Sequence, residues 1–214
     1  MSGPRDAAPA GVAEIHDRPE WWEVTRTRSR FEGAVFSVRT DTVRMPDGEA
    51  VERDLVEHPG AVGVVALDDD DRVLLVRQYR HPPGLMMWEV PAGLRDVDGE
   101  QSWATARREL YEEAGCEARE WLTLVDYRSS PGMSDERMRV FLARGIVEVA
   151  DEDRFVGEHE EKDMPVVWMP LADAVTKVLA GDIHNPTAVT GILAAYTVRA
   201  DGFRDLRPAD APES

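Results

Sequence analysis

The chain has 214 residues, which is enough for one generous domain or for a main domain with a small accessory one. Hydrophobic residues make up 43% and charged residues 31%, a balance typical of soluble globular proteins. With 42 acidic against 25 basic residues, the formal net charge is −17. Such a surface repels nucleic acid, and it repels any anionic metabolite unless metal ions or local arginines reverse the field.

The cysteine content and the hydropathy of the sequence indicate in which cellular compartment the protein resides. The single cysteine, Cys116, excludes an internal disulfide and fits a reducing environment. No run approaches the roughly 18–20 apolar residues of a membrane span. The first residues also lack the basic start and apolar stretch of a secretory signal. We expect a soluble cytoplasmic protein that binds neither nucleic acid nor membrane.

The N-terminal part divides into two segments. Residues 1–20 are rich in Pro, Ala, Gly and charge, and we expect them to be mobile, at least at their start. Residues 21–57 predict a small antiparallel β domain, because VFSVRTDTVRMPDGEAVERDLVEH forms two alternating stretches around a Pro46-Asp47-Gly48 turn. This hairpin is too short to be stable alone, so it must pack on the main domain or on a partner subunit.

Residues 58–203 predict the main domain. Apolar stretches at 61–67 and 72–80 flank an acidic turn and predict a second hairpin. Further strands are expected near 86–93, 121–128, 138–147 and 165–169. Strands with interspersed helices predict an α/β fold, a sandwich with a mixed β-sheet. The polar tail, residues 204–214, is expected to fray.

Three helices are predicted in this domain. The first runs from Ser102, as N-cap, to Ala114, with Gly115 in the left-handed position that ends a helix. The second spans 171–180, and the third is capped by Asn185 with proline at its first position.

The first helix carries an acidic cluster. Glu109, Glu112 and Glu113 stand at i, i+3 and i+4, so their like charges gather on one face and repel one another. A hard divalent cation such as Mg²⁺ removes that penalty. Arg108 and Glu100 can form a charge pair that fixes the helix against the preceding loop. Taken alone, such a cluster is more often a solvated acidic helix face.

The segment from Gly93 to Cys116 resembles the Nudix box, whose form is Gly, five residues, Glu, seven residues, then Arg-Glu-aliphatic-x-Glu-Glu-x-Gly-aliphatic. The match is complete from Glu100 to Gly115. There are two departures, six residues instead of five before Glu100 and Cys116 in the final aliphatic position, and neither touches a metal ligand.

The resemblance implies an α/β/α sandwich around a mixed sheet, and hydrolysis of a nucleoside diphosphate linked to another moiety. It also implies two or three Mg²⁺, or Mn²⁺, ions per site. Glu109 and Glu113 would be ligands, Glu112 would contribute to a further ion, and the backbone carbonyl of Ala92 would complete a site. Arg108 and Glu100 would be structural members of the catalytic site.

Other residues resemble the ADP-ribose pyrophosphatase subfamily. Pro131 lies sixteen positions beyond Gly115, in a loop similar to the one whose acidic residue, here Glu136, meets the terminal ribose. Arg80, in Arg-Gln-Tyr-Arg, matches an arginine that grips a phosphate. The alternatives are an ordinary Pro-Gly turn and a surface arginine at a strand end.

The N-terminal hairpin resembles the small β domain that these enzymes swap across a homodimer. Arg53 and Asp54 would then reach the partner's substrate near the adenine. Phe36 is the nearest candidate for stacking on that ring, and a core phenylalanine is the alternative.

A separate base must activate the attacking water, because the box carboxylates would be committed to metal. Residues 157–164 resemble the acidic loop that supplies this base in the subfamily. Matching Asp163-Met164 to its pattern predicts Glu160 as the base, with Glu161 second. An acidic surface loop without a role is the alternative.

The sequence therefore predicts hydrolysis of a nucleotide-sugar substrate, ADP-ribose, to AMP and ribose 5-phosphate. The alternatives are a Nudix hydrolase of a sugar nucleotide or an oxidised nucleotide, or a non-catalytic ligand sensor with this fold. A sensor should have lost box carboxylates and should carry an added DNA-binding module. In this sequence the box carboxylates are all present, and no such module is seen.

Overall fold

The computed structural model describes residues 15–150, 152, 155 and 164–213. Of the N-terminal segment predicted to be mobile, residues 1–14 lie outside this range. Residues 15–23 are described and form neither helix nor strand. In chain order, the elements are β1 (Val24–Glu32), β2 (Ser37–Arg44), β3 (Ala50–Glu57), β4 (Ala61–Ala66), β5 (Arg72–Arg80), β6 (Leu85–Glu89), β7 (Ala92–Leu94), α1 (Ser102–Ala114), β8 (Cys116–Arg128), β9 (Arg137–Glu148), β10 (Val166–Pro170), α2 (Leu171–Leu179), α3 (Pro186–Arg199) and β11 (Arg207–Pro208).

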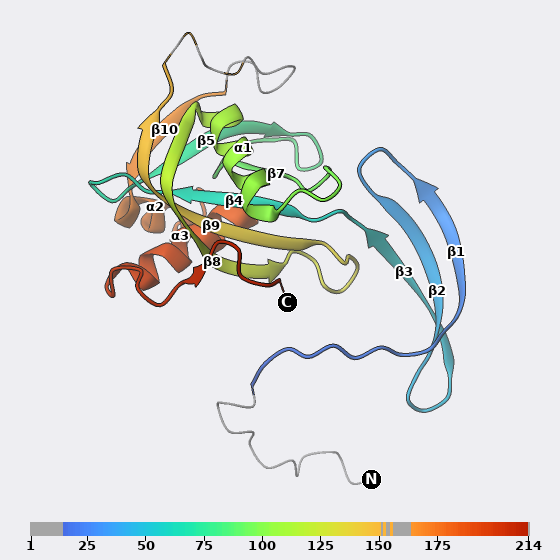
Figure 1. Cartoon of the computed structure of the whole chain (residues 1–214). Helices are drawn as coiled ribbons and strands as arrows, with labels where there is room; N and C mark the ends of the chain where they lie inside the picture. The colour runs from blue at the N-terminus through green and yellow to red at the C-terminus, as the bar shows by residue number, and fades with distance from the viewer. Residues whose placement is uncertain (1–14, 151, 153–154, 156–163, 214) are drawn as a thin grey trace.

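The N-terminal strands form a separate antiparallel sheet in the order β1-β2-β3, which stands to one side of the main domain (Figure 1). The predicted hairpin is present as β2 and β3. Gly48 at its turn has a φ of +90°, a conformation that few residues other than glycine adopt readily. Strand β1 was not predicted, because VTRTRSRFE has almost no apolar alternation and is exposed along nearly its whole length. Pairing with β2 makes it a strand.

The main domain holds a mixed five-stranded sheet in the order β11-β8-β9-β4-β7 and a three-stranded sheet in the order β10-β5-β6. Only β4 and β9 run parallel among the neighbours of the larger sheet. The predicted hairpin of residues 61–67 and 72–80 is confirmed only at its turn, where Leu67 and Val73 form an antiparallel bridge, because β4 and β5 themselves belong to different sheets. Strand β4 pairs with β9 on one edge and with β7 on the other, so no edge remains for β5.

Helices cover both faces of the five-stranded sheet. Alternate residues of β4 point to opposite sides. Val64 packs with Leu110 of α1, whereas Val65 packs with Ile192 of α3. All four side chains are fully buried. The result is the predicted α/β/α sandwich, with α1 on one face and α2 and α3 on the other (Figure 1).

The predicted bounds of α1 are confirmed, and Gly115 ends the helix with a φ of +60°. The prediction of Ser102 as N-cap is wrong. Gln101 occupies the N-cap position without a side-chain hydrogen bond, and Ser102 is the first helical residue. Asn185 caps α3 as predicted, because its side chain accepts a hydrogen bond from the Ala188 amide.

The expectation of a frayed tail is also wrong. Strand β11 pairs with β8, and Arg139 of β9, only 4% exposed, donates to the backbone carbonyls of Ala211 and Pro212 at 2.6 and 3.0 Å. The same guanidinium binds both carboxylate oxygens of Asp126 at 2.7 and 2.9 Å. A buried arginine must satisfy its donors, and here the tail carbonyls help to do so.

Asp126 tests the contribution of this buried ion pair to stability. Burial alone would raise its pKa, but hydrogen bonds from Arg139 and Arg207 outweigh burial and hold the pKa below its usual value. Asp126→Asn should lower the free energy of unfolding by roughly 3 kcal/mol in urea denaturation, because the buried Arg139 charge loses its partner.

The pH dependence follows from the sign of that shift. A lowered folded pKa stabilises the protein above the unfolded pKa of the carboxyl, and the stabilisation disappears as pH falls through the folded value. The difference between wild type and Asp126→Asn should therefore shrink below about pH 4. Asp182→Asn, at an exposed pair with Lys177, is the control. An equal loss in both variants would contradict the assignment.

Candidate active site

Two carboxylates of α1 converge on the short strand β7. The Glu113 carboxylate accepts a hydrogen bond from the Ala92 amide at 2.9 Å. The Glu109 side chain is 10% exposed and lies against Gly93. A β-carbon at Gly93 would collide with the Glu109 carboxyl carbon and both of its oxygens. The glycine that opens the box therefore leaves the space into which a carboxylate of the helix fits.

Arg108 connects the remaining carboxylates. One of its terminal nitrogens, Nη1, lies 2.7 Å from Glu109 Oε1 and 3.1 Å from Glu112 Oε2. Its other terminal nitrogen lies 3.5 Å from Glu100 Oε2, which confirms the predicted charge pair. Burial tends to lower the pKa of Arg108, but the acidic neighbours outweigh it and the pKa is raised. Arg108 thus offsets the repulsion between like charges on α1 and ties the helix to Glu100.

The donors present suit a hard divalent cation. The carboxylates of Glu109 and Glu113 lie against the backbone of Ala92 and Gly93. Glu112, about one helical turn after Glu109, pairs with the same guanidinium, that of Arg108. Carboxylate and carbonyl oxygens are the donors that such a cation prefers. Among the described residues, no three or more His, Cys, Asp or Glu side chains are drawn together into a complete metal site. The assignment of ligands therefore rests on the kind of donor and on its convergence at β7.

A pocket of about 340 Å³ opens beside the loop that leads into α1. The loop lines it with Arg95 and Glu100, and the facing segments contribute His58, Asp135 and Arg137. The pocket thus brings Glu100 of the box close to Asp135, the neighbour of Glu136. It therefore adjoins the predicted site.

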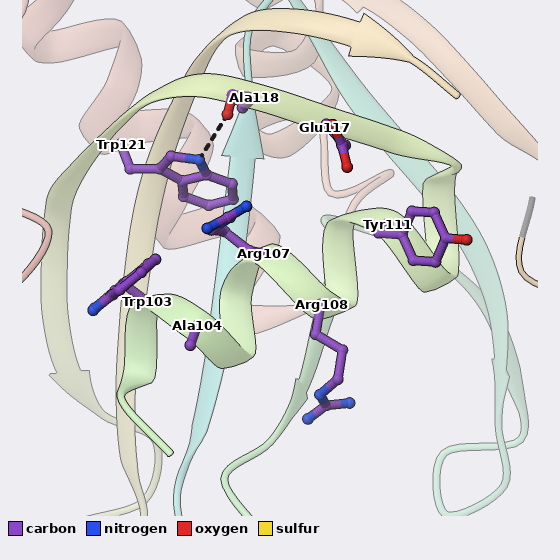
Figure 2. Close-up of a pocket in the computed structure, with 8 residues that line it drawn as sticks. All are labelled: Trp103, Ala104, Arg107, Arg108, Tyr111, Glu117, Ala118 and Trp121. Carbon is purple, nitrogen blue, oxygen red and sulfur yellow. Dashed lines mark hydrogen bonds between the residues drawn. The ribbon is translucent and has the colours of Figure 1, made fainter. Parts of the chain in front are cut away.

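A second pocket, of about 260 Å³, lies between α1 and β8 and is shown in Figure 2. Trp103, Arg107 and Tyr111 line it at four-residue spacing, which places them on the helix face opposite Glu109. The Arg107 guanidinium carbon lies 5.6 Å from the centroid of the Trp103 ring. This pocket is behind the acidic face and does not join the converging carboxylates.

Arg80 is held at the end of β5. Its guanidinium donates two hydrogen bonds, of 2.9 and 2.7 Å, to the carboxylate of Glu89, which is 2% exposed. The Arg80 side chain remains 41% exposed. The sequence did not predict Glu89 as the partner of Arg80, because Glu89 stands opposite Val76, four residues from Arg80 along β5, and only the long arginine side chain closes that distance.

Glu136 lies where the loop after β8 meets the end of β3. Its carboxylate accepts a hydrogen bond from Ser129 and lies 3.5 Å from His58 Nδ1. The backbone of Val56 exchanges hydrogen bonds with Met133 and Asp135 of the same loop. The loop that contains Pro131 is thus also the connection between the N-terminal sheet and the main domain.

Of the residues predicted to reach a partner's substrate, Arg53 and Asp54 lie on β3 and Phe36 directly precedes β2 of the N-terminal sheet, which stands to one side of the main domain (Figure 1). Arg53 and Asp54 are both exposed, and Asp54 accepts a hydrogen bond from Thr40 at 2.5 Å. Phe36 is 43% exposed and packs on Phe31 with ring centroids 5.7 Å apart. The alternative of a core phenylalanine is therefore wrong. Glu160 and Glu161, the predicted bases, lie outside the described residues.

Residues 57–188 match the family model of the NUDIX domain. This span covers more than half of the chain and contains the converging carboxylates, Gly93 and Arg80. The chain belongs to the Nudix family.

In the described ranges, no helix is both long enough and apolar enough to cross a membrane.

Two curated relatives are similar over most of their length. An ADP-ribose pyrophosphatase of Mycobacterium tuberculosis is 47% identical over 189 residues, which cover 88% of this chain and 89% of the relative. An ADP-ribose pyrophosphatase of Bacillus subtilis is 36% identical, over 72% of this chain and 82% of the relative. Among solved structures, one described as an ADP compounds hydrolase aligns with a TM-score of 0.72 and 20% identity. It covers 87% of this chain and 99% of that chain, and it supports the fold.

Gly93→Ala tests the contact between β7 and α1. The added methyl group must displace the Glu109 carboxylate, which is the flexible end of a side chain, so the fold should survive while the acidic cluster changes. We expect a loss of about tenfold or more in kcat/KM, since displacing a carboxylate of the candidate site by about 1 Å is costly. The thermal midpoint should change by only a few degrees.

The measurement pairs steady-state kinetics with thermal unfolding. Gly132→Ala is the matched control, because a β-carbon there would meet nothing within 4 Å. Unchanged kinetics in Gly93→Ala would show that the position of Glu109 is unimportant.

Proposed function

We propose that this protein hydrolyses the pyrophosphate bond of ADP-ribose to AMP and ribose 5-phosphate. The observation that carries the proposal is the convergence of Glu109 and Glu113 on β7 in a chain 47% identical to an ADP-ribose pyrophosphatase over 88% of its length. Every box carboxylate is present, which favours an enzyme over a non-catalytic sensor.

The proposed chemistry needs a divalent cation, Mg²⁺ by preference, with two or three ions per site. Glu109, Glu113 and the carbonyl of Ala92 would hold it, and Glu112 would contribute to a further ion. When bound, such a cation polarises the pyrophosphate and offsets the charge on the leaving phosphate. Arg108 and Glu100 keep the carboxylates in place, as their mutual contacts indicate.

The substrate contacts are proposed on the resemblance and on exposure. Arg80, held by Glu89 yet 41% exposed, would bind a phosphate of ADP-ribose. Glu136, beside the pocket of about 340 Å³, would meet the terminal ribose. Glu160 is the proposed general base and Glu161 the second choice, both from the resemblance alone.

We propose that two chains form a domain-swapped homodimer, in which Arg53, Asp54 and Phe36 of one subunit complete the other's site. The N-terminal sheet and the residues next to its strands support this arrangement because they expose large apolar side chains. Trp21 is 92%, Phe31 51% and Phe36 43% exposed. A three-stranded sheet needs a covered face to be stable, and a second copy would supply that cover.

A substrate panel tests the proposed activity. Purified protein with Mg²⁺ should convert ADP-ribose to AMP and ribose 5-phosphate, as resolved by chromatography, with a higher kcat/KM than for a sugar nucleotide or an oxidised nucleotide. Glu113→Gln should reduce kcat by about a hundredfold or more, because it removes charge from a ligand while keeping its volume.

Glu117→Gln, at an exposed carboxylate four positions further along, is the control and should retain activity. A near-normal kcat in Glu113→Gln at saturating Mg²⁺ would show that Glu113 is not a metal ligand. A preference for another substrate in the panel would refute the assignment to ADP-ribose.

Mixed subunits test the swap. Arg53→Ala should raise the KM for ADP-ribose, and Glu113→Gln should abolish turnover. In a hybrid dimer of the two variants, one site combines the intact Arg53 with the intact Glu113. At ADP-ribose concentrations well below the KM of Arg53→Ala, where each variant alone is poorly active, random mixing should therefore restore about a quarter of the wild-type activity, since half of the dimers are hybrids with one good site each.

Light scattering on the same samples reports the oligomeric state. A fully active monomer would rule out the swap, and so would a mixture no more active than the average of its two components.

A further inference from the structure

The segment after α3 returns to the start of the acidic helix. Strand β11 lies along β8, and Arg139 then holds the carbonyls of Ala211 and Pro212. The next residue along the chain is Glu213. The two hydrogen bonds from a buried arginine thus fix the direction in which the Glu213 side chain leaves the backbone.

The Glu213 carboxylate binds both ends of the loop between β7 and α1. One oxygen accepts a hydrogen bond from the Ser102 hydroxyl, at the first residue of the helix. The other accepts one from Arg95 Nη1 at 2.6 Å, just after β7. The side chains of Glu213 and Arg95 are each 26% exposed. One carboxylate therefore spans the segment that leads into the metal-site helix.

The start of α1 lacks a side-chain cap at its N-cap position, although Glu100, just before it, accepts a hydrogen bond from the Thr105 hydroxyl. Gln101 at the N-cap makes no side-chain hydrogen bond, and the first turn contains no acidic residue. The carboxylates of α1 lie instead in its second half, toward the negative end of the helix dipole, where they are unfavourable. An anion at the first turn is favourable, because unpaired amides and the positive end of the dipole are there. Glu213 brings such an anion from the far end of the sequence.

We propose that Glu213 is a positioning residue of the active site, which clamps the Arg95 loop to the start of α1 and so holds the helix carboxylates against β7. The inference rests on the proposed function for its catalytic consequence, whereas the clamp itself is a property of the free protein. Neither the Nudix box nor its spacing includes this residue.

Glu213→Gln separates the clamp from general stability. The amide keeps the size of the side chain but loses the charge that pairs with Arg95. We expect kcat for ADP-ribose to fall about three- to tenfold while KM changes less than about twofold, because Glu213 binds none of the residues proposed to contact the substrate. Asp210→Asn is the matched control, since Asp210 is an exposed carboxylate of the same segment with no hydrogen bond or ion pair to the described residues.

Hydrogen exchange gives a readout that does not depend on turnover. In Glu213→Gln, amides of residues 95–105 should exchange about tenfold faster, as expected for the loss of a helix cap. Amides of α3 should be unchanged. A role limited to overall stability would accelerate both regions or lower the thermal midpoint without a local change.

Rescue identifies the helix start as the point of action. Gln101 has an extended backbone, with φ −72° and ψ 139°, which is the conformation of a capping residue. Gln101→Asp added to Glu213→Gln should restore protection of the first turn to within about threefold of wild type. Absence of rescue would overturn the assignment to the helix start.

The two proposals fail separately. Unchanged exchange and unchanged kcat in Glu213→Gln, in a wild type that hydrolyses ADP-ribose, would overturn the clamp alone. Faster exchange in residues 95–105 of a protein that leaves ADP-ribose intact would support the clamp and overturn the proposed substrate.

Discussion

The repulsion between three carboxylates on one helical turn is the constraint around which this molecule is arranged. Glu109, Glu112 and Glu113 lie in the half of α1 where the helix dipole is already negative. Each unfavourable term amounts to only about 0.2–1 kcal/mol, but the terms act together on one short helix. Arg108 and the amide of Ala92 offset them within the chain, and the fold has to bring both to the carboxylates.

The approach of α1 to β7 requires that the helix be held firmly against the sheet that contains β7. Ala106 and Leu110 hold it there, because both are fully buried against the five-stranded sheet. Strand β7 is only three residues long and is held by its pairing with β4. A side chain at Gly93 would push the helix carboxylate away, so the close approach depends on a residue without a β-carbon. Packing of the apolar core thereby holds the α1 carboxylates in position, although their like charges repel one another.

Local patterns predicted the parts of this structure that depend on neighbours in sequence. The bounds of α1 and the cap at Asn185 follow from helical spacing and from turn residues that act over a few positions. The error at β4 and β5 has a different origin. A fully buried strand has no alternation that reveals its partner, so the acidic turn between them suggested a hairpin where the chain in fact passes from one sheet to another. Strand β1 was missed because its residues are polar on both faces.

The site shows the same division between chemistry and position. Metal-binding carboxylates must share one helical face, so their spacing is visible in the sequence before any fold is known. Glu89, which holds Arg80, and Glu213, which contacts Ser102, act across strand pairings or from the end of the chain. No spacing rule connects such residues to the groups that they hold, since the fold alone decides that they meet. The motif therefore identifies the carboxylates of the candidate site, and contacts from residues distant in the sequence hold those carboxylates and their neighbours in position.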